Sequence, residues 1–247
     1  MTDLVLKPNE RIDDLQRNGL KIIQNTEAFR FGMDAVLLAD FVRLRPRERV
    51  GDMGTGTGIL ALLLSQKDMS CTFEAFEIQK EMAEMASRSV CLNSLDARIM
   101  VHCEDMRNAW RIVGREKLHA IVCNPPYGKK GGTLTSETQT VSLARHETDC
   151  TIEDVCASCS AVLRNHGRAY MVFPAQRMLE LVDAMRKFRL EPKLIRMVCA
   201  HADKPPYLMM VEAMKNAKPN LLWMPPLIVY NPDGSETEEI MRIYHKL

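Results

Sequence analysis

The segment "GDMGTGTGIL", residues 51–60, constrains the fold more than any other part of the chain. It continues the strand-like segment "RERV" and opens the helix-like segment "GILALLLSQK", with Gly54, Gly56 and Gly58 alternating in between. Glycine reaches positive φ values and allows a ligand close to the backbone, and a loop that feeds a helix N-terminus offers free N–H donors. A tight turn is the plain alternative, but it seldom needs three alternating glycines. We therefore expect a strand-loop-helix unit that holds a ligand.

Strand-like and helix-like segments alternate along the rest of the chain. Helices are expected over residues 34–44, 81–94, 151–167 and 177–188, and strands over 71–78, 97–105, 118–124 and 168–174. This alternation predicts an α/β fold with a mostly parallel sheet, right-handed crossovers and helices on both faces. The later strand-like segments 192–200, 207–214 and 221–234 predict an antiparallel edge. In such sheets, ligands bind beyond the carboxyl ends of the strands.

Charge, hydropathy and cysteines exclude several classes of protein. The 33 basic and 32 acidic residues give a net charge of +1, so any basic surface for nucleic acid must be local. No apolar run reaches the ~18 residues of a membrane span, and the N-terminus lacks the apolar core of a signal peptide. We therefore expect a cytoplasmic protein without membrane partners. The one CxxC, Cys156 and Cys159, lies in a helix-like segment without a second pair of ligands, which favours core packing over a metal site. No linker divides the chain, and residues 1–247 are expected to form a single domain.

The spacing of the glycines discriminates between cofactors. The dinucleotide fingerprint G-x-G-x-x-G would need its third glycine where Ile59 stands, which counts against NAD and FAD. The D-x-G-x-G-x-G pattern of Asp52, Gly54, Gly56 and Gly58 instead resembles the S-adenosylmethionine loop of class I methyltransferases. This resemblance implies S-adenosylmethionine as the cofactor, a Rossmann-like fold with a seven-stranded sheet, and Asp52 as the acceptor for the amino group of the cofactor.

Two more acids follow at the ends of the next two expected strands. Glu77 ends the segment 71–78, where a carboxylate can accept hydrogen bonds from both hydroxyls of a ribose. Glu74 competes with it but stands earlier in the strand, where it is expected to face solvent. Asp105 resembles the acid that meets the cofactor adenine in class I methyltransferases, and Glu104 is the neighbouring alternative. A solvated loop or a helix N-cap is the plain interpretation of each acid alone.

The fourth expected strand ends in "NPPY", residues 124–127. This tetrapeptide resembles the [N/D/S]-P-P-[Y/F/W] motif of methyltransferases that act on adenine N6, cytosine N4, guanine N2 or the glutamine amide. The side-chain oxygen of Asn124 and the carbonyl of Pro125 can each accept one N–H of such an amine, which favours a pyramidal nitrogen in the transition state. The prolines fix the backbone, and Tyr127 offers a ring on which a base can stack. Asn124, Pro125 and Tyr127 are therefore the candidate catalytic residues, and a Pro-Pro chain break is the plain alternative.

Further segments narrow the substrate. The segments "QNTEAFRFGMDAVLLADFV", "LARHETDCTIEDV" and "PPLIVYNPDGSETEEI" resemble the bacterial tRNA1(Val) adenine-37 N6-methyltransferase family, across nearly the whole chain. Glutamine methyltransferases of release factors resemble the core but carry an N-terminal helical domain, and the sequence gives no expectation of such a domain here. The resemblance implies tRNA as the substrate and an N-terminal extension, residues 1–45, that covers the cofactor pocket.

The resemblance also implies contacts for both substrates. The candidate cofactor contacts beyond the loop, Glu77 and Asp105 are Gln24, Phe31, Gly32, Asp34 and Asn124, with core packing as the alternative for Phe31. The candidate substrate contacts are Pro126, Tyr127, Lys129, Lys130, Arg145 and His146. Lys129 and Lys130 are drawn from the basic clusters of the sequence and not from the resemblance, and in the loop after Tyr127 they can meet a phosphate. The alternatives are a solvated loop, or a phosphate contact at Arg186, Lys187 and Arg189 instead. Arg145 and His146 are placed near phosphate or base, or in a solvated first helical turn.

The sequence thus predicts a monomeric S-adenosylmethionine-dependent enzyme that methylates N6 of adenine in tRNA, with adenine 37 of tRNA-Val as the expected site. Within the same chemistry, the alternatives are an rRNA guanine-N2 or a protein-glutamine methyltransferase. From another class, the alternative is a non-catalytic module that binds S-adenosylmethionine or RNA. A module without chemistry has no need for both Asn124 and Tyr127.

Overall fold

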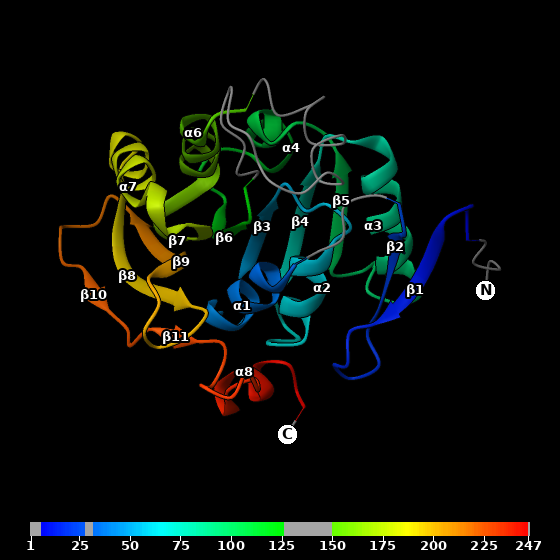
Figure 1. Ribbon diagram of the computed structural model, residues 1–247. Coiled ribbons are helices and arrows are strands. Elements are labelled where there is room, and N and C mark those ends of the chain that lie inside the picture. The colour runs from blue at the N-terminus through cyan, green and yellow to red at the C-terminus, as the bar shows by residue number, and fades with distance from the viewer. Residues whose placement is uncertain (1–5, 28–31, 126–149, 247) are drawn as a thin grey trace.

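The computed structural model describes residues 6–27, 32–125 and 150–246 (Figure 1). A nine-stranded sheet crosses these residues in the order β10-β8-β9-β7-β6-β3-β4-β5, and β11 pairs with the end of β8. The strands are β3 (Arg49–Met53), β4 (Thr72–Glu77), β5 (Ile99–Cys103), β6 (Leu118–Cys123), β7 (Leu163–Pro174), β8 (Leu190–Cys199), β9 (Pro206–Lys215), β10 (Leu222–Trp223) and β11 (Leu227–Ile228). Within the described part of this sheet, only β9 runs against its neighbours, so the predicted mostly parallel sheet with an antiparallel edge region is confirmed. The predicted number of seven strands is wrong, because the two-residue strands β10 and β11 join the seven strands β3 to β9. Both lie in the segment 221–234, which was expected at the antiparallel edge but pairs parallel to β8.

Helices cover both faces of the sheet, as predicted. One core joins α1 (Met33–Phe41), α2 (Ile59–Ser65), part of α3 (Lys80–Leu92) and α8 (Glu238–Ile243) to the sheet. The other core joins α4 (Ala109–Val113), α6 (Ile152–Val162) and α7 (Met178–Lys187) to the opposite face. Short 3-10 turns, η1 (Met106–Asn108) and η2 (Ala175–Arg177), precede α4 and α7. Strand β6 contributes side chains to both cores, since Val122 belongs to the first core and Cys123 to the second. Its nearly continuous apolar run is what a strand buried on both faces requires.

One helix end differs from its prediction by five residues. The helix that was expected to end at Gly167 ends at Val162, and the chain passes at once into β7. His166 takes the left-handed φ of 56° within this strand. A Cβ on Gly167 would lie 2.8 Å from Leu163 Cδ2 and 2.9 Å from the Arg164 carbonyl oxygen. The glycine therefore serves an irregular strand start, which has the same sequence signature as a helix end.

A two-stranded hairpin, β1 (Glu10–Asp14) and β2 (Lys21–Asn25), lies along α3 (Figure 1). The Ile23 N–H donates to Ser89 Oγ at 2.9 Å, and the Arg88 guanidinium pairs with the Glu10 carboxylate. β2 therefore leads the chain back along α3 before α1 begins. The single domain over residues 1–247 and the covering role of residues 1–45 stay predictions. Over the described ranges, no helix combines the length and the hydropathy of a membrane span.

Candidate functional site

The predicted site residues of the sheet lie at the carboxyl ends of the adjacent parallel strands β5, β4, β3 and β6. Backbone hydrogen bonds hold these strand ends together. The N–H groups of Gly54 and Thr55 donate to the Phe76 carbonyl at 3.0 and 2.9 Å, and the Glu104 N–H donates to the Glu77 carbonyl at 3.0 Å. The glycine loop and the two acidic strand ends thus form one continuous rim.

The glycine loop needs its glycines for conformational reasons. Gly54, Gly56 and Gly58 have φ values of 76°, 58° and 91°, a region that residues with side chains rarely adopt. At Gly58, a Cβ would also lie 3.3 Å from the Cβ of Ala86 in α3. At Gly56, the only neighbour within 4 Å among the described atoms is the Met82 methyl, at 3.9 Å. The loop therefore leaves open space beside Gly56, in front of the N-terminus of α2.

Asp52 lies under this loop with no exposed surface. Its Oδ2 accepts hydrogen bonds from the Thr55 hydroxyl at 2.5 Å and from the Ala61 N–H at 3.2 Å. The pKa of Asp52 is raised to about 7. Burial is the main cause, the two hydrogen bonds oppose it, and the nearby charge of Glu77 adds to it. Its Oδ1 is buried and has no hydrogen-bond partner in the described part of the chain. Asp52 thus ties the glycine loop to the first turn of α2, and its predicted contact with the cofactor amino group stays a prediction.

Glu77 supports the loop from the neighbouring strand. Its side chain is nearly buried, and its two oxygens accept from the N–H groups of Gly56 at 3.0 Å and Gln79 at 2.9 Å. Glu74 takes no part, since its carboxylate binds the Arg49 guanidinium at 2.7 Å and His102 Nε2 at 2.7 Å. Glu77 is therefore the acid of β4 that borders the loop, as the sequence indicated, but Glu74 is ion-paired instead of solvated.

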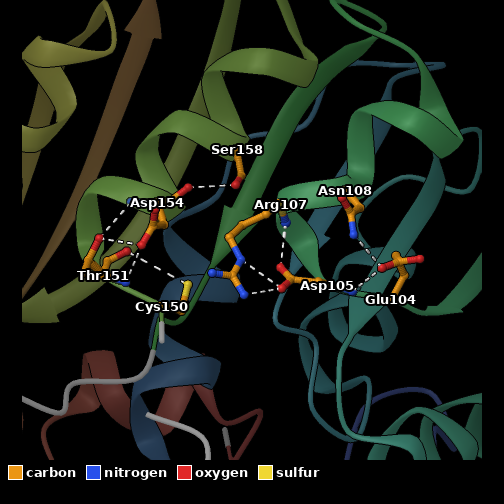
Figure 2. A network of polar contacts seen from close by, with 8 residues as sticks. All are labelled: Glu104, Asp105, Arg107, Asn108, Cys150, Thr151, Asp154 and Ser158. Carbon is orange, nitrogen blue, oxygen red and sulfur yellow. Dashed lines mark hydrogen bonds and ion pairs between the residues drawn. The ribbon is translucent and has the colours of Figure 1, made fainter. Parts of the chain in front are cut away.

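The next strand end carries Glu104 and Asp105 in one polar network, in which the Asp105 N–H donates to Glu104 Oε1 at 3.0 Å (Figure 2). Asp105 caps η1 by accepting from the Arg107 N–H at 2.8 Å, and its other oxygen binds the Arg107 guanidinium. Burial raises the pKa of Asp105, but the hydrogen bonds and charge of Arg107 outweigh it and leave the pKa lowered. Glu104 accepts from Asn108 Nδ2 at 3.0 Å, which lowers its pKa. Both carboxylates are thus held by their own turn, and the predicted contact of Asp105 with adenine stays a prediction.

The end of β6 brings in a residue from the N-terminal part of the chain. The Cys123 thiol is buried and donates to the Met53 carbonyl at 3.0 Å, which fixes the end of β6 beside β3. The next residue, Asn124, donates from Nδ2 to Asp34 Oδ2 at 2.9 Å. Pro125 follows and is buried. Asp34 was predicted as a cofactor contact, and its pairing with Asn124 has no signal in the sequence because 90 positions separate the two residues.

The structure also describes two other predicted cofactor contacts, Gln24 and Gly32. Gln24 in β2 is only 3% exposed and donates to Asp13 in β1, and its Oε1 has no partner among the residues of the described ranges. Gly32 directly precedes α1 and stands two positions before Asp34. The remaining predicted contacts lie outside the described residues: Phe31, Pro126, Tyr127, Lys129, Lys130, Arg145 and His146.

The CxxC is a core feature, as predicted. Cys156 and Cys159 are buried in the core between α6 and the sheet, and burial raises the pKa of both thiols. No three histidine, cysteine or acidic side chains gather as a metal site within residues 6–27, 32–125 and 150–246.

The open space at the glycine loop and the buried acid beneath it are compatible with S-adenosylmethionine. The glycine loop offers open space beside backbone N–H groups at a helix N-terminus. Below it lies Asp52, whose buried Oδ1 lacks a partner among the described residues. A buried carboxylate of this kind is stabilised by a nearby positive charge, and S-adenosylmethionine carries both an ammonium and a sulfonium. Glu77 places a second carboxylate at the edge of the same loop, and its predicted contact with a ribose stays a prediction.

Comparison with known proteins supports the same interpretation. Residues 32–191 match the family model described as "Methyltransferase small domain". A tRNA1(Val) (adenine(37)-N6)-methyltransferase of Citrobacter koseri is 31% identical over 168 residues, 66% of this chain and 67% of the relative. The protein of the same name from Photobacterium profundum is 27% identical over 72% of this chain and 75% of the relative. A predicted O-methyltransferase from Agrobacterium tumefaciens has the same fold, with a TM-score of 0.71 and 24% identity over 86% of this chain and 96% of that one.

Proposed function

Because this chain belongs to the methyltransferase small domain family, we propose that it transfers a methyl group from S-adenosylmethionine to an exocyclic amine, at N6 of adenine in tRNA. The relatives named as tRNA1(Val) (adenine(37)-N6)-methyltransferases make adenine 37 of that tRNA the expected site. The single observation that carries the proposal is the placement of Asn124 and Pro125 at the end of β6, on the same rim as the glycine loop of β3.

The chain's own residues supply geometry and charge. When bound, S-adenosylmethionine would supply an electrophilic methyl group. The amine supplies the electron pair of the new N–C bond, the electrons of the broken S–C bond stay on the cofactor sulfur, and the methylated nitrogen loses one proton to solvent. We assign the acceptors for the two amine hydrogens to Asn124 Oδ1 and the Pro125 carbonyl. An exocyclic amine delocalises its lone pair into the ring, so acceptors that hold it pyramidal free the lone pair for the methyl carbon. They stabilise the positive charge that develops on nitrogen, which is electrostatic preorganisation.

We assign the remaining contacts as the sequence predicts them. The loop glycines, Gln24, Phe31, Gly32, Asp52 and Glu77 form the cofactor side, and Asp105 meets the adenine of the cofactor. Pro126 and Tyr127 provide the surface on which the substrate base stacks. Lys129, Lys130, Arg145 and His146 meet the phosphates and bases around it. We also propose that the enzyme acts as a cytoplasmic monomer without a metal. A gel-filtration mass near twice 28.1 kDa, or loss of activity with EDTA, contradicts the corresponding part.

The test is methyl transfer to total tRNA from a strain that lacks the enzyme, with labelled S-adenosylmethionine and nucleoside mass spectrometry. We expect N6-methyladenosine with the wild-type protein, and a loss of at least about 100-fold in kcat with Asn124→Ala, the magnitude typical of removing one preorganised group. Asn165→Ala, an exposed asparagine of β7, is the matched control and keeps wild-type activity. N2-methylguanosine or methylated glutamine as the product overturns the adenine assignment. Binding of S-adenosylmethionine without any transfer favours the non-catalytic module.

A further inference from the structure

We propose that Asp34 is a positioning residue that orients the Asn124 side-chain amide, so that its oxygen and not its NH2 group meets the substrate amine. This inference rests on the proposed function, and it changes the role of Asp34 from a cofactor contact to a partner of the catalytic asparagine. It depends on one hydrogen bond, on the geometry around Gly32 and on the chemistry of an amide.

The hydrogen bond joins the first turn of α1 to the end of β6. Asn124 Nδ2 lies 2.9 Å from Asp34 Oδ2, and both side chains are half-buried. The other oxygen of Asp34 accepts from the Ala35 N–H at 2.9 Å. The two oxygens of Asp34 are thus both engaged, one by the helix backbone and one by the Asn124 amide.

The chemistry of the pair then determines the direction of the amide. An asparagine carries donors on one side and an acceptor on the other, and the two groups differ little in shape. An ionised carboxylate has only acceptors, so it selects the NH2 side of Asn124. Oδ1 consequently points away from Asp34. The proposed mechanism needs an oxygen there, because an NH2 group would present donors to the N–H donors of the substrate.

The charge of Asp34 adds to the effect of its position. A hydrogen bond to an ionised acceptor is stronger than a neutral one, and it shifts electron density of the amide toward Oδ1. That oxygen becomes a better acceptor as positive charge develops on the attacking nitrogen. The contribution therefore belongs to the transition state and predicts an effect on kcat more than on KM.

Gly32 gives an independent reason to place the carboxylate here. Its φ of −95° is open to any residue, so its backbone conformation does not explain the glycine. A Cβ at this position would instead lie 2.8 Å from Asp34 Oδ1. Any larger residue must displace the carboxylate. Gly32 thus keeps the space that Asp34 needs to reach Asn124, and it becomes a second position at which the inference can be tested.

The first test compares Asp34→Asn with Asp40→Asn, an exposed acid of the same helix. Steady-state kinetics with tRNA and calorimetry with S-adenosylmethionine are measured for both. For Asp34→Asn we expect kcat to fall about 10- to 100-fold, the range for outer partners that orient a functional residue, with the Kd of the cofactor unchanged within twofold. Gly32→Ala should lower kcat in the same direction. Asp40→Asn should behave as wild type. A raised cofactor Kd with wild-type kcat at saturation means that Asp34 is a cofactor contact, and overturns the inference.

The second test exchanges the partners. Asn124→Asp alone places two carboxylates within hydrogen-bond distance of each other and should lose activity. In the double variant Asp34→Asn/Asn124→Asp, the amide donates to the carboxylate, and an oxygen again faces the substrate. We expect the double variant to exceed Asn124→Asp in kcat by at least about tenfold, a coupling that a merely structural role does not produce. No recovery, with all variants folded by circular dichroism, refutes the orienting role. An inactive wild-type protein instead refutes the proposed function.

Discussion

The buried carboxyl of Asp52 predicts an unusual dependence of stability on pH. Burial raises its pKa from an ordinary 3.8 to about 7, so between these two values the folded protein holds a proton that the unfolded chain has released. Stability from this group is therefore fully present below pH 3.8 and is lost as the pH rises toward 7. This direction is opposite to that of an ion-paired aspartate, which stabilises at neutral pH.

The variant Asp52→Asn removes the titration and keeps the shape. The amide oxygen can still accept from the Thr55 hydroxyl and the Ala61 N–H. Wild-type stability should fall by about 1.4 kcal/mol per pH unit within the window, relative to the variant. Between pH 5 and pH 8 the difference amounts to about 3 kcal/mol. For a chain of this size, that corresponds to a relative shift in Tm of roughly 6–12 °C.

The assay is thermal melting of both proteins from pH 5 to pH 9 without cofactor. We expect the Tm of Asp52→Asn minus the Tm of the wild type to increase with pH up to pH 7. Above pH 7.5 this difference should stay constant. A constant difference across the range refutes the raised pKa. A second readout is calorimetry of S-adenosylmethionine binding at pH 6 in two buffers of different ionisation enthalpy. If the cationic cofactor binds beside Asp52, the wild type releases a proton on binding and the variant does not.

Three further predictions concern the loop and the core. Gly58→Ala should lower the free energy of unfolding by about 1–2 kcal/mol in urea, and by more than Gly19→Ala, because both glycines have positive φ but only Gly58 has a neighbour for its Cβ. Glu77→Gln should raise the Kd of S-adenosylmethionine about tenfold by calorimetry, since it removes the charge beside the loop, whereas the exposed Glu116→Gln should leave it unchanged. Lys215→Met should lower the free energy of unfolding by about 1–3 kcal/mol without changing kcat. The buried ammonium of Lys215 donates hydrogen bonds to the Glu116 carboxylate and to the carbonyls of Ser160 and Leu163, and the variant leaves these acceptors without their donor. Lys218→Met, at an exposed lysine, is the control.

The mostly parallel sheet and the position of the rim could be predicted from the sequence, because both follow from short-range patterns. Alternating strands and helices allow few topologies, and the glycine loop marks a strand end without reference to the rest of the chain. The exact bounds depend on tertiary contacts. Gly167 looked like a helix end, but the helix gives way to β7 five residues earlier, where the chain must pair with β6.

The roles of the acids could be predicted less well than their positions. Spacing placed Glu77 and Asp105 at the ends of β4 and β5, where the structure has them. It could not show that the Arg107 guanidinium donates to the Asp105 carboxylate. The arginine side chain has many rotamers, and only some of them make this contact. Nor could it show that His102 on β5 and Arg49 on β3 hold Glu74, since these contacts arise from the lateral order of strands.

The pairing of Asp34 with Asn124 shows that a sequence motif alone does not determine how its side chains are oriented. The sequence identifies Asn124 through its prolines, and a bare motif specifies an amide without saying which end of it faces the substrate. That choice depends on a carboxylate from another part of the chain, placed by the first turn of α1 and by the absence of a side chain at Gly32. Because orientation is a separate requirement, Asp34 must change together with Asn124 for activity to survive, whereas Gly32 leaves space for either side chain at position 34. Partial exchange should therefore cost more activity than full exchange of the pair.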